Sequence, residues 1–286
     1  MKKLLSILTL FLSISAVAGG GWPKEKGKGY FKLSEWWIVA DKHFTGSGKI
    51  DPNATRGTFT TSVYGEYGIT NRLTGIAYVP LFVRTYQNAQ ISGTTGQVLG
   101  KGEALNSFGD VNIGLKYGLT KSNSKYVAAA TLTLGLPTGN SSGGTDGSFQ
   151  TGDGEFNQMI QFDISRSFKL GSIHAFANAY SGFNNRTNNY SDEFRYGAEL
   201  GAAFAKQKLW FFTKLNVIES LKNGLTTPDG AGSIFSNNME FASYTLEAAY
   251  YLNKEWGITV GYSGAIRGEI IFANPAYSIG IFLDLK

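Results

Sequence analysis

The most regular feature of this chain is an alternation of apolar and polar residues, repeated in about twelve runs of roughly ten residues. In the run 109–119, for example, Val111, Ile113 and Leu115 share one side of an extended chain, and polar or small residues share the other. Because successive side chains of a strand point to opposite faces, this pattern predicts β-strands with one apolar face. The predicted strands are 30–40, 58–68, 73–85, 109–119, 125–136, 155–167, 172–183, 193–205, 209–218, 240–252, 255–267 and 276–285.

The connections between these strands alternate between short and long. Residues 69–72 and 206–208 are tight turns, whereas residues 137–154 form a long stretch rich in Gly, Ser and Thr. Outer-membrane barrels have short periplasmic turns and longer outer loops, and strands of about ten residues are long enough to cross hydrocarbon at a tilt. The pattern therefore predicts an all-β fold, an antiparallel up-and-down transmembrane β-barrel of about 12 strands.

The first residues have the features of an export signal. Lys2 and Lys3 precede the apolar stretch 4–14, and Ala16 and Ala18 supply the small residues of a cleavage site. The apolar stretch is too short for a membrane-spanning helix, which needs about 20 residues. We therefore expect export, with cleavage after Ala18.

The chain is expected to divide into three parts: a signal peptide (1–18), a short periplasmic N-terminal segment (19–29) and an outer-membrane β-barrel (30–286). The middle part carries Lys24 and Lys26 and is expected to be a mobile tail, with a plug inside the barrel as the alternative. A single all-β barrel of this length forms one domain.

Composition favours a barrel over other classes. The chain has 37 Gly, 20 Phe, 15 Tyr and 5 Trp, and no Cys. Rings suit the two membrane interfaces, and glycine suits a crowded lumen. The net charge of +5 falls to about +3 without the two lysines of the signal, too little to favour a nucleic-acid partner. The expected partners are outer-membrane lipid and, during biogenesis, the barrel-assembly machinery.

Charged residues on or near the polar faces are candidates for lining the lumen, because a charge in a membrane-spanning strand must pair or contact water. These lumen candidates are Glu66, Asp110, Lys116, Asp163, Arg195, Glu199, Lys214, Glu247 and Arg267. Their mixed signs leave two alternatives, a water-filled polar channel or a salt-bridged network that closes the lumen. A closed or narrow lumen is favoured, since side chains and one loop can fill a barrel of about 12 strands.

Four aromatic residues share parity with polar neighbours and are candidates for an apolar patch inside the barrel. They are Tyr64, Tyr78, Trp210 and Phe212. If these rings point inward, they suit an aromatic or aliphatic solute.

Patterns for catalysis or metal binding are weak. The two histidines, His43 and His174, lack the downstream spacing of barrel phospholipases. Asp146, Asp153 and Glu155 lie in a glycine-rich loop, where turn chemistry is a sufficient reason for them. We expect no enzyme activity, no catalytic residue, no metal and no cofactor.

Several glycine turns and strand entries match those of one family. The stretches that carry the match are 67–73, 109–111, 115–117, 134–139 and 152–154. They resemble the outer-membrane β-barrel family named for the MetA pathway of phenol degradation, which includes XagA-type proteins. The resemblance implies a channel or transporter suspected of passing hydrophobic or aromatic compounds, and it carries over no site residue. Many such barrels end on an aromatic residue, whereas this chain ends at Lys286, with Phe282 close by.

The functional hypothesis is an outer-membrane channel for small, hydrophobic or aromatic molecules that works passively. The first alternative is a structural or surface-recognition barrel that acts through its long outer loops. A barrel lipid hydrolase ranks last, because no catalytic motif accompanies His174.

Overall fold

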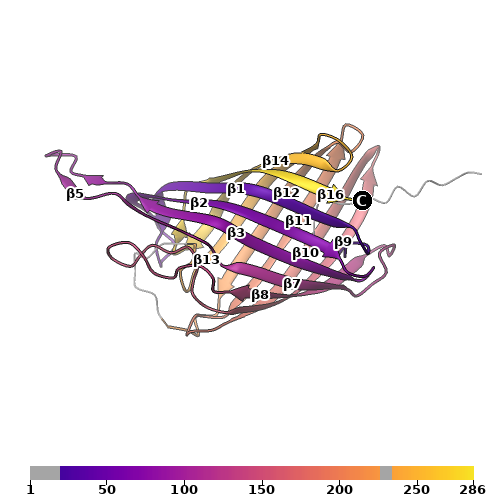
Figure 1. Ribbon diagram of the computed structural model, residues 1–286, viewed down its shortest axis with the longest axis horizontal. Helices are drawn as coiled ribbons and strands as arrows, with labels where there is room; N and C mark the ends of the chain where they lie inside the picture. The colour runs from indigo at the N-terminus through magenta and orange to yellow at the C-terminus, as the bar shows by residue number, and fades with distance from the viewer. Residues whose placement is uncertain (1–19, 226–233) are drawn as a thin grey trace, which may run out of the picture.

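The computed structural model describes residues 20–225 and 234–286, in which twelve long antiparallel strands form one closed barrel (Figure 1). Each long strand pairs with the next one along the chain, and β1 closes the barrel by pairing with both β2 and β16. The strands are β1 (Gly29–Phe44), β2 (Ile50–Gly68), β3 (Leu73–Gln87), β7 (Val111–Gly118), β8 (Val127–Leu136), β9 (Asn157–Leu170), β10 (Ile173–Arg186), β11 (Glu193–Phe204), β12 (Leu209–Ser220), β13 (Glu240–Tyr251), β14 (Trp256–Glu269) and β16 (Ala276–Leu285). The fold expected from the alternation is confirmed.

Four short strands complete the sheet system. They are β4 (Gln90–Ile91), β5 (Val98–Gly100), β6 (Glu103–Ser107) and β15 (Ile271–Phe272). β6 pairs with β3 and β15 with β1, whereas β4 and β5 form a hairpin that projects beyond the barrel (Figure 1). Among the described residues, no helix is long and apolar enough to cross a membrane.

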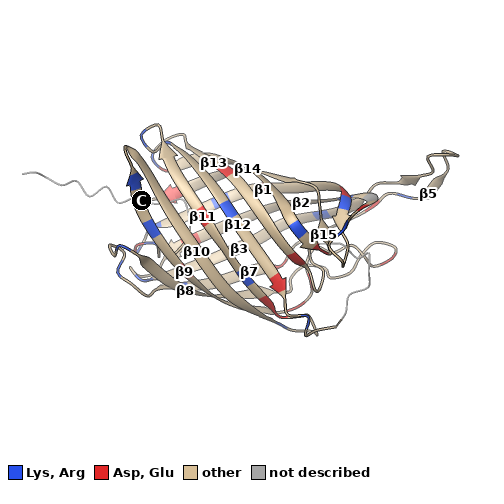
Figure 2. Cartoon of the chain, turned by 180° about the vertical axis from the view of Figure 1, so that it is seen from behind, with Lys and Arg blue, Asp and Glu red and all other residues tan. Residues whose placement is uncertain are grey.

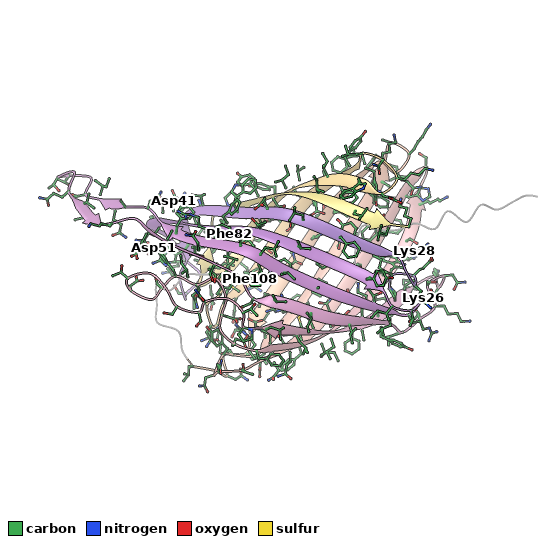
Figure 3. The ribbon with its side chains drawn as sticks, viewed as in Figure 1. Lys26, Lys28, Asp41, Asp51, Phe82 and Phe108 are labelled. Carbon is green, nitrogen blue, oxygen red and sulfur yellow. The ribbon has the colours of Figure 1, made fainter. Side chains whose placement is uncertain are left out.

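The two ends of the barrel differ in their connections. The short-turn end carries the tight connections 69–72, 171–172, 205–208 and 252–255. The long-loop end carries the β4–β5 hairpin and the connection between β8 and β9. In Figure 3, Lys26 and Lys28 mark the short-turn end, and Asp41 and Asp51 mark the opposite end.

The structure extends two of the predicted strands at the long-loop end. β1 continues to Phe44 and β2 begins at Ile50, so that these strands reach past the predicted limits of 40 and 58. The extensions are still paired, through contacts such as His43 with Asp51. Polar and charged residues in these extensions hid them from a search for alternation, although backbone pairing does not need apolar side chains.

The two faces of the wall follow the alternation. On β7, Ile113 and Leu115 are exposed on the outside, whereas Lys116 is buried inside. Large apolar side chains cover the outer surface, and most of the strand length carries neither acidic nor basic residues (Figure 2). A surface of this kind suits hydrocarbon rather than water.

Aromatic rings form a row on the outer face toward the long-loop end. Trp37 stacks on Tyr277 with 5.9 Å between ring centroids, Tyr277 contacts Tyr262 at 5.5 Å, and Tyr262 contacts Tyr244 at 6.0 Å. Rings in such a row match the aromatic girdle of a membrane interface.

Candidate functional site: the barrel interior

The long-loop half of the lumen contains a cavity of about 610 Å³. Its apolar side is lined from β1, β12, β13 and β15 by residues that include Trp36, Ile38, Ile218, Phe241 and Phe272. Its polar side is lined from β7, β9, β10 and β11 by residues that include Asn112, Asn157, Asn184 and Arg195. The cavity therefore offers an apolar wall and a hydrogen-bonding wall to the same molecule.

Asp110 lies on the rim of this cavity, just before β7. Its carboxylate accepts hydrogen bonds from the backbone amides of Gly139 (2.8 Å) and Asp153 (2.7 Å). Burial raises the pKa of Asp110 to about 6, although the two amides act in the opposite direction. The charge on the rim therefore changes in a mildly acidic medium.

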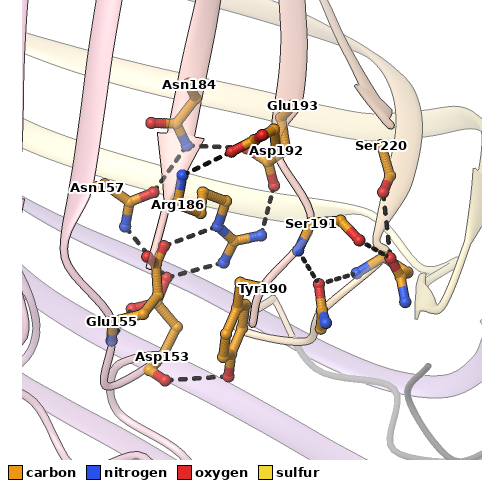
Figure 4. A network of polar contacts seen from close by, with 12 residues as sticks. Asp153, Glu155, Asn157, Asn184, Arg186, Tyr190, Ser191, Asp192, Glu193 and Ser220 are labelled. Carbon is orange, nitrogen blue, oxygen red and sulfur yellow. Dashed lines mark hydrogen bonds and ion pairs between the residues drawn. The ribbon is translucent and has the colours of Figure 1, made fainter. Parts of the chain in front are cut away.

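Arg186 holds the rim of the cavity together (Figure 4). Its guanidinium forms ion pairs with Asp153 (3.1 Å), Glu155 (2.7 Å) and Glu193 (2.8 Å), and its side chain is only 4% exposed. Glu193 also pairs with Arg195 at 2.5 Å. A guanidinium with three carboxylates in its fork fixes the loop before β9 against β10 and β11.

No pattern in the sequence predicts this cluster. Asp153 and Glu155 carry only a weak indication of metal binding, and Arg186 and Glu193 belong to no motif. The residues come from three segments that meet only in the folded barrel, so spacing along the chain gave no signal. Among the described residues, no group of three or more acidic or histidine side chains is arranged to hold a metal ion.

The short-turn half of the lumen is filled by buried ion pairs. Lys116 of β7 pairs with Glu66 of β2 at 3.3 Å, with both side chains 5% exposed or less. Lys32 of β1 pairs with Glu247 of β13 at 3.1 Å. The first pair spans β3 and the second spans β14 and β16, so each pair joins nearby strands of the wall. The paired side chains occupy space inside the barrel and are expected to narrow the passage.

Three further predicted charges belong to the same region. Glu199 of β11 lies 3.9 Å from Lys214 of β12. Asp163 of β9 accepts hydrogen bonds from the amide groups of Gln161 (2.9 Å) and Asn178 (3.2 Å). Mixed charges and amides therefore surround the middle of the lumen.

Aromatic rings fill the remaining space at the short-turn end. Trp210 and Phe212 are buried and stacked, with centroids 6.0 Å apart, and Phe176 packs against both. Tyr64 packs against the same cluster and donates its hydroxyl to Glu66 at 2.5 Å. Rings and ion pairs thus form one continuous filling rather than separate layers.

The N-terminal segment lies across the short-turn mouth. The amide of Gly21 donates to the Ser165 hydroxyl at 2.8 Å, and Trp22 packs edge-on against Phe176 at 5.8 Å. The amide of Lys24 donates to the Thr74 hydroxyl at 2.8 Å. The expectation of a mobile tail is therefore corrected: residues 20–28 are bound at the short-turn mouth to strands between β3 and β10 and to the turn after β2. The expected signal peptide lies outside the described residues.

Eight of the nine predicted lumen charges point into the barrel or line its cavity, and Arg267 does not. Arg267 lies on the outer face at the long-loop end, 53% exposed, and pairs with Glu219. The reason is a bulge in β14. Ala242 of β13 pairs with Arg267, whereas the next residue of β13, Ser243, pairs with Ala265. One extra residue in a strand turns the following side chains to the other face.

The four predicted aromatic residues do not form one patch. Tyr64, Trp210 and Phe212 belong to the buried filling of the short-turn half, whereas Tyr78 lines the outer cavity. The sequence analysis also missed Lys32, which completes the pair with Glu247.

The two histidines lie far apart. His43 is in β1 opposite Asp51, and His174 is the second residue of β10, opposite Ala203. Their positions at opposite ends of the barrel do not bring the two imidazoles into one site.

Comparisons with known proteins show a likeness of fold. No family model matches the chain, and no curated protein matches it. The structure of the COG4313 outer membrane channel from Pseudomonas putida F1 is similar to this chain with a TM-score of 0.60 and 13% identity, over 94% of this chain and 100% of that chain. The transport unit of the autotransporter AIDA-I from Escherichia coli is similar with a TM-score of 0.51 and 8% identity, over 97% of this chain and 94% of that chain. At these identities the likeness shows an outer-membrane-type β-barrel fold.

Proposed function

We propose that this chain is an outer-membrane channel that admits small molecules through the long-loop end and passes them to the periplasm. The short turns face the periplasm in this orientation, as in other barrels of this kind. The observation that supports the proposal best is the cavity of about 610 Å³, which is large enough to hold a small organic molecule. The fold shared with the COG4313 outer membrane channel agrees with it.

The apolar wall favours hydrophobic or aromatic solutes. Trp36, Ile218 and Phe241 supply a surface on which a ring can pack, while the asparagines of the other wall meet polar substituents. Transport needs no energy source in this scheme. A solute enters the cavity from outside and loses part of its hydration shell where it contacts the apolar wall. It then passes the filled half when the ion pairs and the N-terminal segment move aside.

Liposome swelling with two solutes of equal charge tests the proposal. Tryptophan and glutamine are both zwitterions, so a difference in rate reports on the ring. We expect tryptophan to enter proteoliposomes faster than glutamine. Phe241→Ser, which removes part of the apolar wall, should reduce this preference, whereas Ile266→Ser on the exposed outer face should leave it unchanged.

The possible results separate the parts of the proposal. Swelling no faster than in protein-free liposomes would contradict a channel. Swelling at equal rates with both solutes would leave a channel but contradict the preference for apolar rings.

Surface recognition is the second candidate function. The β4–β5 hairpin projects from the barrel and exposes Ile91, Val98 and Leu99 to solvent. Replacing residues 89–101 by a short turn should leave solute flux unchanged if the barrel interior is the functional part. Loss of flux in this variant would instead favour a function of the outer loops.

A further inference from the structure

A groove on the outer face of β1, β2 and β3 lies beside the aromatic row. Its side chains on this face are Trp37, Val39, Phe59, Arg84 and Tyr86. Gly57 of β2 has no side chain, and the ring of Tyr86 lies directly over it. The side chains that line the groove on this face are apolar or aromatic except for one guanidinium.

The strand register places Arg84 at the end of the aromatic row. Tyr277 of β16 is opposite Trp37, Trp37 is opposite Phe59, and Phe59 is opposite Arg84. The next strand contributes Asn106, whose carbonyl oxygen accepts a hydrogen bond from Arg84 at 2.9 Å. A cation thus lies level with rings that mark a membrane interface.

The guanidinium of Arg84 has more N–H donors than its contacts within the chain use. A guanidinium has five N–H donors, and the bond to Asn106 uses one of them. Its other contact is with the ring of Tyr86, 5.7 Å away. In the part of the chain that the structure describes, no acidic side chain forms a salt bridge with Arg84, which is exposed.

We propose that this groove binds a phosphate group of lipid A, the phosphorylated anchor of lipopolysaccharide, in the outer leaflet. A guanidinium presents paired donors that match phosphate oxygens. Apolar residues such as Leu81 and Phe82 are exposed beside the groove and can contact acyl chains. The groove lies on the long-loop side, which faces the outer leaflet in the orientation of the proposed function, and the inference rests on that orientation.

The barrel carries a matched control at its other end. Arg166 of β9 is also exposed on the outer face, lies 5.3 Å from the ring of Tyr126 and donates to its hydroxyl at 3.2 Å. Arg166 therefore resembles Arg84 in charge, exposure and aromatic contact. It lies toward the short-turn end, where the inner leaflet contains phospholipid rather than lipopolysaccharide.

Native mass spectrometry of the full-length barrel in detergent tests the proposal. Bisphosphorylated lipid A, dephosphorylated lipid A and phosphatidylglycerol are titrated onto wild type, Arg84→Gln and Arg166→Gln. We expect the wild type and Arg166→Gln to bind bisphosphorylated lipid A equally. Arg84→Gln should bind bisphosphorylated lipid A about tenfold more weakly than the wild type, because a charge-assisted hydrogen bond is lost. Dephosphorylated lipid A should bind all three proteins weakly.

Three outcomes would overturn the proposal. Equal binding of lipid A by Arg84→Gln and wild type would exclude the guanidinium. Equal losses in Arg84→Gln and Arg166→Gln would show a general effect of charge. Tighter binding of phosphatidylglycerol than of lipid A would assign the groove to a phospholipid.

Liposome swelling separates this proposal from the channel function. Arg84→Gln should transport solutes like the wild type, since Arg84 lies outside the lumen. A protein that binds lipid A but transports nothing would contradict the proposed channel and leave the lipid site intact.

Discussion

The two halves of the lumen are built from the same strands but differ in what fills them. Toward the long loops, inward positions carry asparagines such as Asn112 and Asn157 on one side and large apolar side chains such as Trp36 and Phe241 on the other, and a cavity remains between them. Toward the short turns, inward positions carry large rings such as Trp210 and buried ion pairs such as Lys116 with Glu66. The comparison teaches that the same twelve strands leave a cavity where inward side chains do not meet, and none where rings and ion pairs pack against one another.

In the proposed channel, the difference would also divide the functional roles. An open half lined by an apolar and a polar wall can select a solute, whereas a filled half can limit its passage. Substitutions of residues that line the outer cavity, away from the buried Arg186 cluster, should therefore change selectivity with little effect on stability. Substitutions in the inner half should change stability and conductance together.

The largest effect is expected from breaking a buried pair in the inner half. Lys116→Met leaves the Glu66 carboxylate, 2% exposed, without its cation and should destabilise the barrel by about 3–5 kcal/mol. Arg195→Met in the outer half should cost less than about 1 kcal/mol, because Arg195 is 32% exposed and Glu193 keeps its pair with Arg186. Urea unfolding in detergent measures both, and equal losses would contradict the division into two halves.

The next largest loss of stability is expected when a charge is placed on the lipid face rather than in the lumen. Ile160→Arg places a guanidinium on the outer wall, where Ile160 is 45% exposed, and should cost roughly 2–4 kcal/mol. Met159→Arg, one residue away, points into the cavity, where water and acidic groups can meet the charge. Unfolding in lipid vesicles should show a clearly smaller loss for Met159→Arg. Similar losses would mean that the cavity excludes water.

The pair Ile258 and Thr259 tests the same point less well. Thr259 faces inward, as the alternation predicts, but it is 2% exposed. An arginine at Thr259 would be overcrowded whatever its charge, so a loss of stability there would not report on the face.

How much of the fold and of the site could be predicted from the sequence depends on how far apart the interacting residues lie along the chain. The strands and most of their faces were predictable, because the contrast between Leu115 and Lys116 is encoded by neighbouring residues. The cover over the short-turn mouth was not, because Gly21 bonds to Ser165, 144 residues away. Arg267 was misplaced because a bulge leaves no trace in the alternation.

Glu35 shows where the alternation itself is broken. It shares the outer face of β1 with Leu33 and Trp37, and both of its carboxylate oxygens accept the hydroxyl of Thr61 at 2.9 Å. No sequence pattern singles out Glu35, since a lone acid in a strand carries no sign of the face it occupies until pairing is known.

A smaller effect, on conductance rather than stability, should come from the N-terminal segment. A Cβ at Gly21 would lie 2.6 Å from the backbone oxygen of Val127, so Gly21→Val should displace residues 20–28 from the mouth. Single-channel recordings in planar bilayers should show a several-fold rise in conductance. Gly93→Val is the control, because nothing lies within 4 Å of its Cβ. An unchanged conductance would show that the cover does not limit flow.

The smallest effect concerns charge on the rim of the outer half. Burial raises the pKa of Asp110 to about 6, above its usual 3.8, so the folded protein holds this proton more tightly than the unfolded chain. The resulting contribution to stability is present in acid and is lost as the pH rises through about 6. Above that pH the carboxylate is charged, and the channel should prefer cations more strongly at pH 7 than at pH 5. Reversal potentials across bilayers with a salt gradient measure this preference.

Two variants decide whether Asp110 is responsible. Asp110→Asn should remove the pH-dependent step, because its amide does not titrate in this range. Asp146→Asn, in an exposed part of the long loop between β8 and β9, should keep the step. A step that survives in Asp110→Asn would assign the titration to another group on the rim, and the outer half would then owe its selectivity to the Arg186 cluster rather than to Asp110.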